Sequence, residues 1–143
     1  MSSAPPQKKL GRLLRDPFLS GNARLHEEFA ARGHPEIRPV HGNVFPFLDD
    51  AGTRVSVLAE RAQVTKQSMA ELVAHLESRG YVERTPDPSD RRAKLVRATA
   101  RGRKLYAIAS EVSDDVEREW ARRLGRDKMR RLRALLEELN AVL

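Results

Sequence analysis

Apolar residues recur every three or four positions along most of this chain, which is the spacing of amphipathic helices. The first such stretch covers residues 10–31. Pro17 should kink or divide it, Ser20 could cap the second piece, and Gly33 and Pro35 should end it. The pattern therefore predicts one bent helix or two shorter helices near the N-terminus.

A second periodic stretch, PVHGNVFPFLDDAG, occupies residues 39–52. Its apolar positions fall every four residues, which predicts a short helix. Pro46 should disturb this helix, and Gly52 should lie near its end.

Residues 53–80 predict two short helices joined by a tight turn. Ser56 can cap the first helix, residues 62–64 form the turn, and Thr65 is a good N-cap for the second helix. Gly80 lies just past the end of the second helix, where a left-handed residue is expected. One face of that helix carries a buried stripe at i, i+3, i+4 and i+7, formed by Met69, Leu72, Val73 and Leu76. This arrangement is a helix-turn-helix pattern.

The period then changes from helical to alternating. Residues 81–84 and 95–98 are short alternating segments on either side of residues 86–94, which predicts a β-hairpin with a long tip. Within the tip, Asp87 and Asp90 can accept hydrogen bonds from loop amides or pair with a neighbouring arginine, which leaves Arg91 or Arg92 to project. A helix-turn-helix followed by a hairpin is a winged helix-turn-helix, so the predicted fold is mainly α with a small β-hairpin wing.

Two more helices follow the hairpin. Thr99 caps the first, which runs to about Leu124; Gly125 breaks it, and Asp127 can cap the last one. Together they offer more apolar surface than a lone helix pair can bury, and residues 105–143 carry 8 basic and 8 acidic residues, for no net charge. We expect this part to meet a second copy of the chain, with packing inside one subunit as the alternative.

The net charge of +7 is concentrated in the middle of the chain. Residues 61–104 carry 11 Lys and Arg against 5 Asp and Glu, whereas residues 1–60 carry 8 against 7. A localised excess of positive charge favours a surface that binds a polyanion. The alternative is an exposed charged face that only interacts with solvent.

Several classes of protein are disfavoured by composition. The chain has no cysteine, so disulfides, cysteine zinc sites and thiol chemistry are excluded. No stretch resembles a signal peptide or a membrane span, and no phosphate-binding loop or nucleophile motif is present. We expect a cytoplasmic protein that is not an enzyme and needs no cofactor.

Residues 55–102 resemble the MarR family of winged-helix transcription regulators. The most specific part is DPSDRR after GYVER, followed by a strand and a Thr-x-x-Gly helix start. The resemblance implies a homodimeric repressor, joined by its terminal helices, that binds a pseudo-palindromic site on double-stranded DNA. It also implies a small-ligand site between the dimer helices and the DNA-binding lobes. The corresponding organisation is a disordered arm (1–8), an N-terminal dimerisation helix (9–36), a DNA-binding lobe (37–100) and C-terminal dimerisation helices (101–143).

Carried over by position, the resemblance makes the beginning of the second helix of the motif a DNA-reading element. Lys66 suits a phosphate, and Gln67 can pair with adenine. Glu71 stands where many members have an arginine; it could accept from a cytosine amino group, or simply pair with His75 or an arginine. The full set of predicted DNA-binding residues is Thr65, Lys66, Gln67, Ser68, Glu71, Arg91, Arg92 and Lys94.

The sequence also contains candidate residues for a small-ligand pocket and for a metal site. Candidate pocket residues are Arg38, His41, Phe45 and Trp120, although such side chains are at least as often core. His34, Glu36 and His41 lie close together, but their spacing fits no compact zinc signature, so no metal is expected. The competing function is a winged-helix module that contacts protein or RNA without operator specificity.

Overall fold

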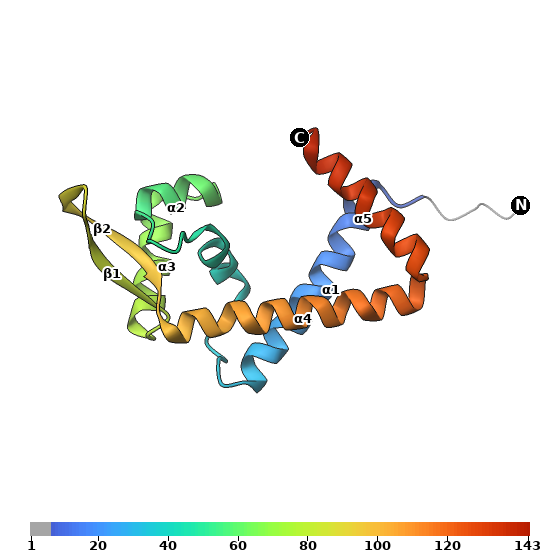
Figure 1. Ribbon diagram of the computed structural model, residues 1–143, viewed down its shortest axis with the longest axis horizontal. Helices are drawn as coiled ribbons and strands as arrows, with labels where there is room; N and C mark the ends of the chain where they lie inside the picture. Colours follow the sequence, from blue (N-terminus) through green and yellow to red (C-terminus); the bar gives the residue numbers. More distant parts are fainter. Residues whose placement is uncertain (1–6) are drawn as a thin grey trace, which may run out of the picture. The chain divides into compact units, whose positions relative to one another are not determined.

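The computed structural model describes residues 7–143, so residues 1–6 of the predicted arm lie outside the described residues. The described chain is mainly helical and carries one two-stranded antiparallel hairpin (Figure 1), which confirms the predicted fold class. In chain order the elements are α1 (Leu10–Ala31), η1 (Pro39–Asn43), η2 (Phe45–Phe47), α2 (Val55–Ala62), α3 (Lys66–Ser78), β1 (Val82–Asp87), β2 (Asp90–Ala98), α4 (Ala100–Leu124) and α5 (Arg126–Ala141).

The chain divides into two compact units. One, here called the lobe, comprises residues 26–109; the other, the terminal unit, comprises the described part of residues 1–25 together with residues 110–143. Helices α1 and α4 each contribute residues to both units. Across residues 7–143, none of the helices combines the length with the apolar character that a membrane-spanning segment requires.

Helix α1 is continuous through Pro17, so the predicted division into two pieces is wrong, and Ser20 lies inside the helix rather than at a cap. A proline inside a helix removes one backbone hydrogen bond, in this case to the carbonyl of Leu13. All of the residues from 10 to 20 are exposed, so this carbonyl is on a stretch of helix open to solvent. One lost bond in a 22-residue helix leaves the turns on both sides intact.

The stretch predicted as one disturbed helix forms two 3-10 helices instead. Pro39 and Pro46 each stand in the first turn of one of them. Proline is tolerated there because its missing N–H would have no partner in the helix anyway. Two prolines seven positions apart therefore start two short helices and prevent one longer α-helix, while Val44 between them is fully buried.

The helix-turn-helix agrees closely with its sequence pattern. Gln63 ends α2 in the left-handed conformation with φ 55°, and the Thr65 hydroxyl caps α3 by accepting from the Ser68 amide at 3.1 Å. The core of the motif consists of fully buried Leu58, Met69, Val73 and Leu76. One detail is wrong: α2 begins after Arg54, so Ser56 lies in its first turn and does not cap it.

The wing is a longer and tighter hairpin than predicted. Its strands pair from Val82 opposite Ala98 to Asp87 opposite Asp90, with an irregularity after Pro86, so the tip is only Pro88 and Ser89. The predicted first strand ends before Pro86, whereas β1 continues through it. Proline is tolerated there because β1 is an edge strand, where a residue without an N–H need not lose a ladder hydrogen bond. On the other side β2 pairs with Thr53, whose amide and carbonyl bond the backbone of Val96 at 2.8 and 2.9 Å.

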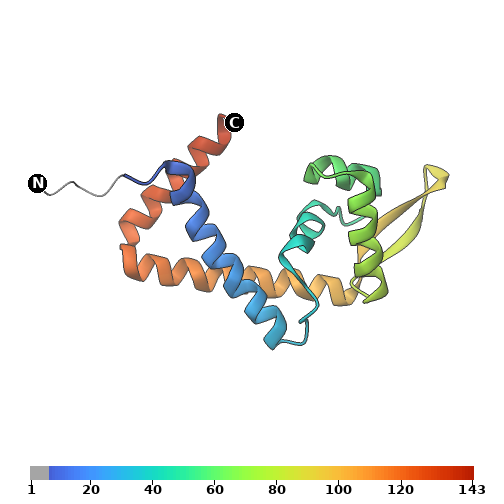
Figure 2. The ribbon, with the colours of Figure 1, turned by 180° about the vertical axis from the view of Figure 1, so that it is seen from behind.

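In the terminal unit, α5 folds back from the end of α4 toward the beginning of α1 (Figures 1 and 2). Gly125 joins α4 to α5 with a positive φ of 103°, as its predicted role as helix breaker requires. The residue at the cap of α5 is Gly125, so Asp127 stands in the first turn and is not the predicted cap. Arg24 of α1 donates to Glu119 of α4 at 2.6 Å.

Candidate nucleic-acid interface

The first turn of α3 presents an exposed polar surface because its apolar residues point the opposite way. Thr65 and Ser68 satisfy each other: the Thr65 hydroxyl donates to the Ser68 hydroxyl at 2.8 Å and accepts from the Ser68 amide. Lys66 and Gln67 are exposed, and within residues 7–143 their side chains form no ion pair or hydrogen bond. These two side chains are therefore available to an external partner.

The wing tip is held by Asp87, which is buried although it is an acid. One of its carboxylate oxygens, Oδ1, accepts from the amide and the hydroxyl of Ser89 at 2.9 and 2.7 Å. The other, Oδ2, accepts from the guanidinium of Arg54, at 2.8 Å from Nε. These hydrogen bonds, first those from Ser89 and then that from Arg54, lower the pKa of Asp87 to about 2. The tip is thereby fixed to the beginning of α2.

Three of the five cations of the wing take no part in such side-chain contacts within residues 7–143. The amide of Arg92 donates to Asp90 Oδ1 at 2.9 Å, so this contact engages the backbone of Arg92 and leaves its guanidinium free. Arg91, Arg92 and Lys94 are exposed, and none of their side chains forms a salt bridge within the described residues. A hairpin with a rigid tip thus carries three uncompensated positive charges.

Other cations of the lobe are neutralised locally. Salt bridges join Arg61 to Asp49, Arg84 to Glu77, Arg97 to Glu83 and Arg101 to Glu36. Within the basic stretch 61–104, seven cations have no acidic partner among the described residues: Lys66, Arg79, Arg91, Arg92, Lys94, Arg103 and Lys104. The beginning of α3 and the wing together make up most of this set, and the two elements lie side by side (Figure 1).

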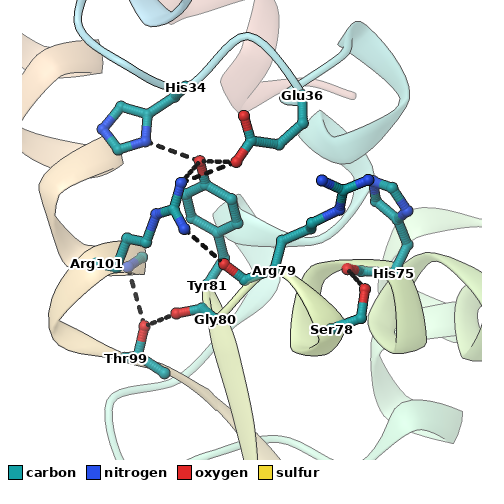
Figure 3. Close-up of polar contacts among 10 residues, drawn as sticks. His34, Glu36, His75, Ser78, Arg79, Gly80, Tyr81, Thr99 and Arg101 are labelled. Carbon is teal, nitrogen blue, oxygen red and sulfur yellow. Dashed lines mark hydrogen bonds and ion pairs between the residues drawn. The ribbon is translucent and has the colours of Figure 1, made fainter.

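A polar network at the base of the wing joins three parts of the lobe, and Figure 3 shows the contacts of His34, Glu36 and Arg101 meeting at the Tyr81 hydroxyl. Arg101 donates to the carbonyl of Arg79 at the end of α3 (2.9 Å) and to Glu36 in the loop after α1 (2.8 Å). Its guanidinium also lies over the ring of Tyr81, 4.4 Å from the centroid. The network holds the end of α3, the beginning of β1 and the loop in one arrangement.

Tyr81 and His34 are the buried members of this network. The Tyr81 hydroxyl donates to Glu36 at 2.7 Å, so His34, whose Nδ1 lies 2.7 Å away, must donate to the same oxygen. Burial, followed by the bond to Glu36, raises the pKa of Tyr81 to about 12. Burial and nearby Arg101 lower the pKa of His34, whereas hydrogen bonds from its own backbone amide and from Tyr81 lower the pKa of Glu36.

The residues considered for a metal site have other partners. His34 and Glu36 are both bonded to Tyr81. His41 instead stacks on His75, with ring centroids 5.2 Å apart, and its Nδ1 accepts from the Arg38 amide at 2.9 Å. Among the residues that the structure describes, no group of three or more His, Asp or Glu side chains is placed to hold a metal ion.

The predicted pocket residues do not share one set of neighbours. Phe45 packs edge-on against Tyr106, 5.8 Å between centroids, and accepts a hydrogen bond from the Tyr106 hydroxyl at its carbonyl. Trp120 belongs to the terminal unit, where it lines an apolar groove of about 950 Å³ with Phe18 and Leu132. The assignment of Arg38, His41, Phe45 and Trp120 to a ligand site therefore stays a prediction.

Arg54, Tyr81 and Arg101 were not found from the sequence, although they hold the interface together. One signal for Arg101 was the Thr-x-x-Gly helix start. The Thr99 hydroxyl caps α4 by accepting from the Gly102 amide at 3.1 Å, as predicted, and this places Arg101 beside Tyr81.

The hairpin, the helix-turn-helix and the cationic surface that they share define a winged helix-turn-helix protein. The sequence profile of the MarR family matches residues 38–93. Transcriptional regulator HosA from Escherichia coli O111:H- is 31% identical over 130 residues, which cover 88% of this chain and 96% of that protein. HTH-type transcriptional regulator FarR from Neisseria gonorrhoeae is 34% identical over 82 residues, 57% of this chain and 56% of that protein.

Solved structures show the same fold. The reduced form of MarR from Escherichia coli matches with a TM-score of 0.79 at 23% identity, covering 94% of this chain and 98% of that one. A transcriptional regulator from Thermotoga maritima matches with a TM-score of 0.65 at 26% identity, covering 92% of each chain. The chain belongs to the MarR family of transcriptional regulators.

Proposed function

We propose that the chain is a homodimeric repressor that binds a pseudo-palindromic site on double-stranded DNA through the first turn of α3 and the wing. The observation that carries this proposal is the set of exposed cations without acidic partners, Lys66 on α3 and Arg91, Arg92 and Lys94 on the wing. Cations left unpaired on two adjacent projecting elements suit the phosphates of a duplex, whose charges are closely spaced on both sides of a groove.

The roles of the side chains follow from their positions. Gln67, exposed in the first turn of the recognition helix α3, can donate to and accept from an adenine edge in the major groove. Lys66, Arg92 and Lys94 neutralise phosphates, and Arg91 enters the adjacent groove or contacts the backbone beside it. Thr65 keeps the first turn of α3 capped and donates its hydroxyl proton to Ser68, whose own hydroxyl proton can be donated to a phosphate oxygen.

Two-fold pairing is supported by the apolar surface of the terminal unit. Phe18 is 68% exposed, Leu135 62% and Val142 79%, which is unusual for large apolar side chains on helices. A second copy would cover these faces, with residues 9–36 and 101–143 as dimerisation regions. Operator binding also places the chain with the genome, which for the bacterial relatives is the cytoplasm. Release by a small ligand stays a prediction from the family resemblance.

Selection of bound duplexes from a random pool tests the proposal. We expect one enriched site with two inverted half-sites whose centres lie about one helical turn apart, because a two-fold protein reads each half with one wing and one α3. The control is a pool of duplex RNA, which should give no enriched sequence. A winged-helix module that contacts protein or RNA would give no symmetric DNA site, and this outcome would reject the repressor.

A further inference from the structure

Glu71 differs from the other acids beside the proposed interface because it has no partner. Glu77 is paired with Arg84, Glu83 with Arg97, and Asp87 with Arg54. Glu71 is exposed on α3, and within residues 7–143 its carboxylate forms no ion pair or hydrogen bond. Pairing with His75 was one expectation, but the His75 ring stacks on His41 instead. The carboxylate is therefore free for an external donor.

Glu71 lies on the same exposed face of α3 as Gln67, so both side chains would face the same bound duplex. Gln67, Glu71, Ala74 and Ser78 follow one another at helical spacing and are all exposed, on the face opposite the buried Met69, Val73 and Leu76. Residues four apart on a helix have Cβ atoms roughly 5–6 Å apart. Ala74, the next residue along this face, is too small to shield the carboxylate, so a groove that receives Gln67 also receives Glu71.

A carboxylate in this position discriminates sharply among possible contacts. It is repelled by phosphates and by the acceptors that guanine and thymine present in the major groove. Adenine offers an amino group, but its N7 acceptor lies beside that group, whereas cytosine presents its 4-amino group as a donor alone. A carboxylate held against base edges is thus stabilised best by cytosine.

We propose that Glu71 determines base specificity by accepting a hydrogen bond from the 4-amino group of one cytosine in each half-site. This rests on the proposed function, since it requires that α3 lie in the major groove. It assigns to Glu71 a role in selection and none in general affinity, where a negative charge can only weaken binding.

The test compares two isosteric changes on the same helix. Glu71→Gln and Glu77→Gln each remove one negative charge from α3, but Glu77 is held by Arg84 at 3.1 Å whereas Glu71 is free. Duplexes are selected from a random pool with the wild-type chain and with both variants. Wild type and Glu77→Gln should both require cytosine at one position of each half-site, and Glu71→Gln should change that position toward adenine, which glutamine prefers.

A second measurement uses the wild-type site directly. The cytosine·guanine pair at that position is changed to thymine·adenine, which replaces the amino donor by a carbonyl acceptor. Affinity for the wild-type chain should fall at least about fivefold, and affinity for Glu71→Ala should be insensitive to the change.

The outcomes separate the two levels of the account. If the wild-type chain selects a symmetric site but Glu71→Gln selects the same bases with uniformly higher affinity, Glu71 acts only as a repulsive charge and the inference is overturned. If the wild-type chain selects no symmetric site at all, the proposed function fails first, and the role of Glu71 fails with it.

Discussion

His41 is a buried histidine in η1 whose surroundings disfavour its charged form. The parallel His75 ring covers one face, with 4° between the ring planes, and the Nδ1 atom accepts from the Arg38 amide. Burial, followed by the positive potential of His75, Arg38 and His26, lowers the pKa of His41 to about 4. Its ring is therefore neutral near pH 7, with the proton on Nε2.

This low pKa predicts a specific loss of stability in mild acid. The unfolded chain, in which His41 has an ordinary pKa of 6.5, binds more protons than the folded chain between pH 6.5 and about 4. The free energy of unfolding should therefore fall as the pH falls through this window, by up to about 3 kcal/mol from His41, with a further contribution from His34. Denaturant unfolding of wild type and His41→Gln at several pH values measures how the free energy of unfolding of each protein depends on pH. Equal pH slopes for the two proteins would contradict this assignment.

Individual roles were predictable from the sequence only where the partner is close along the chain. The Thr65 cap joins residues 3 positions apart, and its pattern is visible in the sequence. Arg54 and Asp87 are 33 positions apart, and Arg101 and Glu36 are 65 apart. Such pairs depend on how the elements pack in the fold, so no local pattern could identify them.

Among the elements, α4 and the base of the wing approach each other so closely that a side chain does not fit between them. A Cβ atom on Gly102 would lie 2.1 Å from the carbonyl oxygen of Tyr81 and 3.3 Å from the Ala98 side chain. Thr99 strengthens the same contact, because its amide donates to the Tyr81 carbonyl at 3.1 Å and its hydroxyl to Gly80 at 2.6 Å. The beginning of α4 and the beginning of β1 are therefore fixed backbone to backbone.

Gly102→Ala should consequently separate these elements or unfold the lobe. We expect a loss of at least about 2 kcal/mol in the free energy of unfolding, because the obstructing atom is backbone and cannot rotate away. Gly11→Ala is the matched control, since Gly11 is also helical but has nothing within 4 Å of an added Cβ. That change should be neutral or stabilise α1 by up to about 1 kcal/mol. Urea unfolding of both variants checks the pair, and similar midpoints for the two would refute the contact.

Proline explains most of the differences between predicted and observed elements. Pro17, Pro46 and Pro86 are expected from the sequence to interrupt or end an element, yet α1 continues through Pro17 and β1 through Pro86. Whether a proline ends an element depends on what its missing N–H would have bonded, and for an edge strand that depends on sheet order. Helical periodicity, by contrast, identified α3, α4 and α5, because apolar residues that gather on one side of a helix leave a repeating pattern in the sequence.

At the scale of the molecule, the terminal unit has an apolar surface that a single chain leaves exposed to solvent. The groove lined by Leu13, Leu14 and Leu132 is accompanied by exposed Leu10, Leu135 and Leu139. The sequence predicted this surplus from the stripe on α5 and from the absence of net charge. Under the repressor proposal, the partner that covers this surface is a second copy of the chain.

Two substitutions on α5 separate dimerisation from folding. Leu132→Glu places a charge in the apolar groove at a side chain that is already 41% exposed, so the single chain should tolerate it while the dimer should dissociate. Ala134→Glu lies on the opposite face of the helix, about 200° away, and should leave the dimer intact. Sedimentation measures the mass of each, with circular dichroism to confirm the fold. Dimeric Leu132→Glu, or a monomeric wild type, would contradict this interface.

The central claim is that the wing and the beginning of α3 bind one DNA duplex together. Substitution of Arg91 tests this claim most directly. The Arg91 side chain is exposed near the start of β2, close to the wing tip, without a partner in the described chain, so Arg91→Ala should leave fold and dimer unchanged. Arg122→Ala, which removes the same charge from exposed α4 in the terminal unit, is the control.

The measurement is a fluorescence anisotropy titration of the selected duplex across a salt series with wild type and both variants. The account predicts that Arg91→Ala weakens binding by about tenfold or more and reduces the salt slope by about two for the pair of chains, whereas Arg122→Ala binds like wild type. Wild-type affinity in Arg91→Ala, or an equal loss in Arg122→Ala, would contradict it.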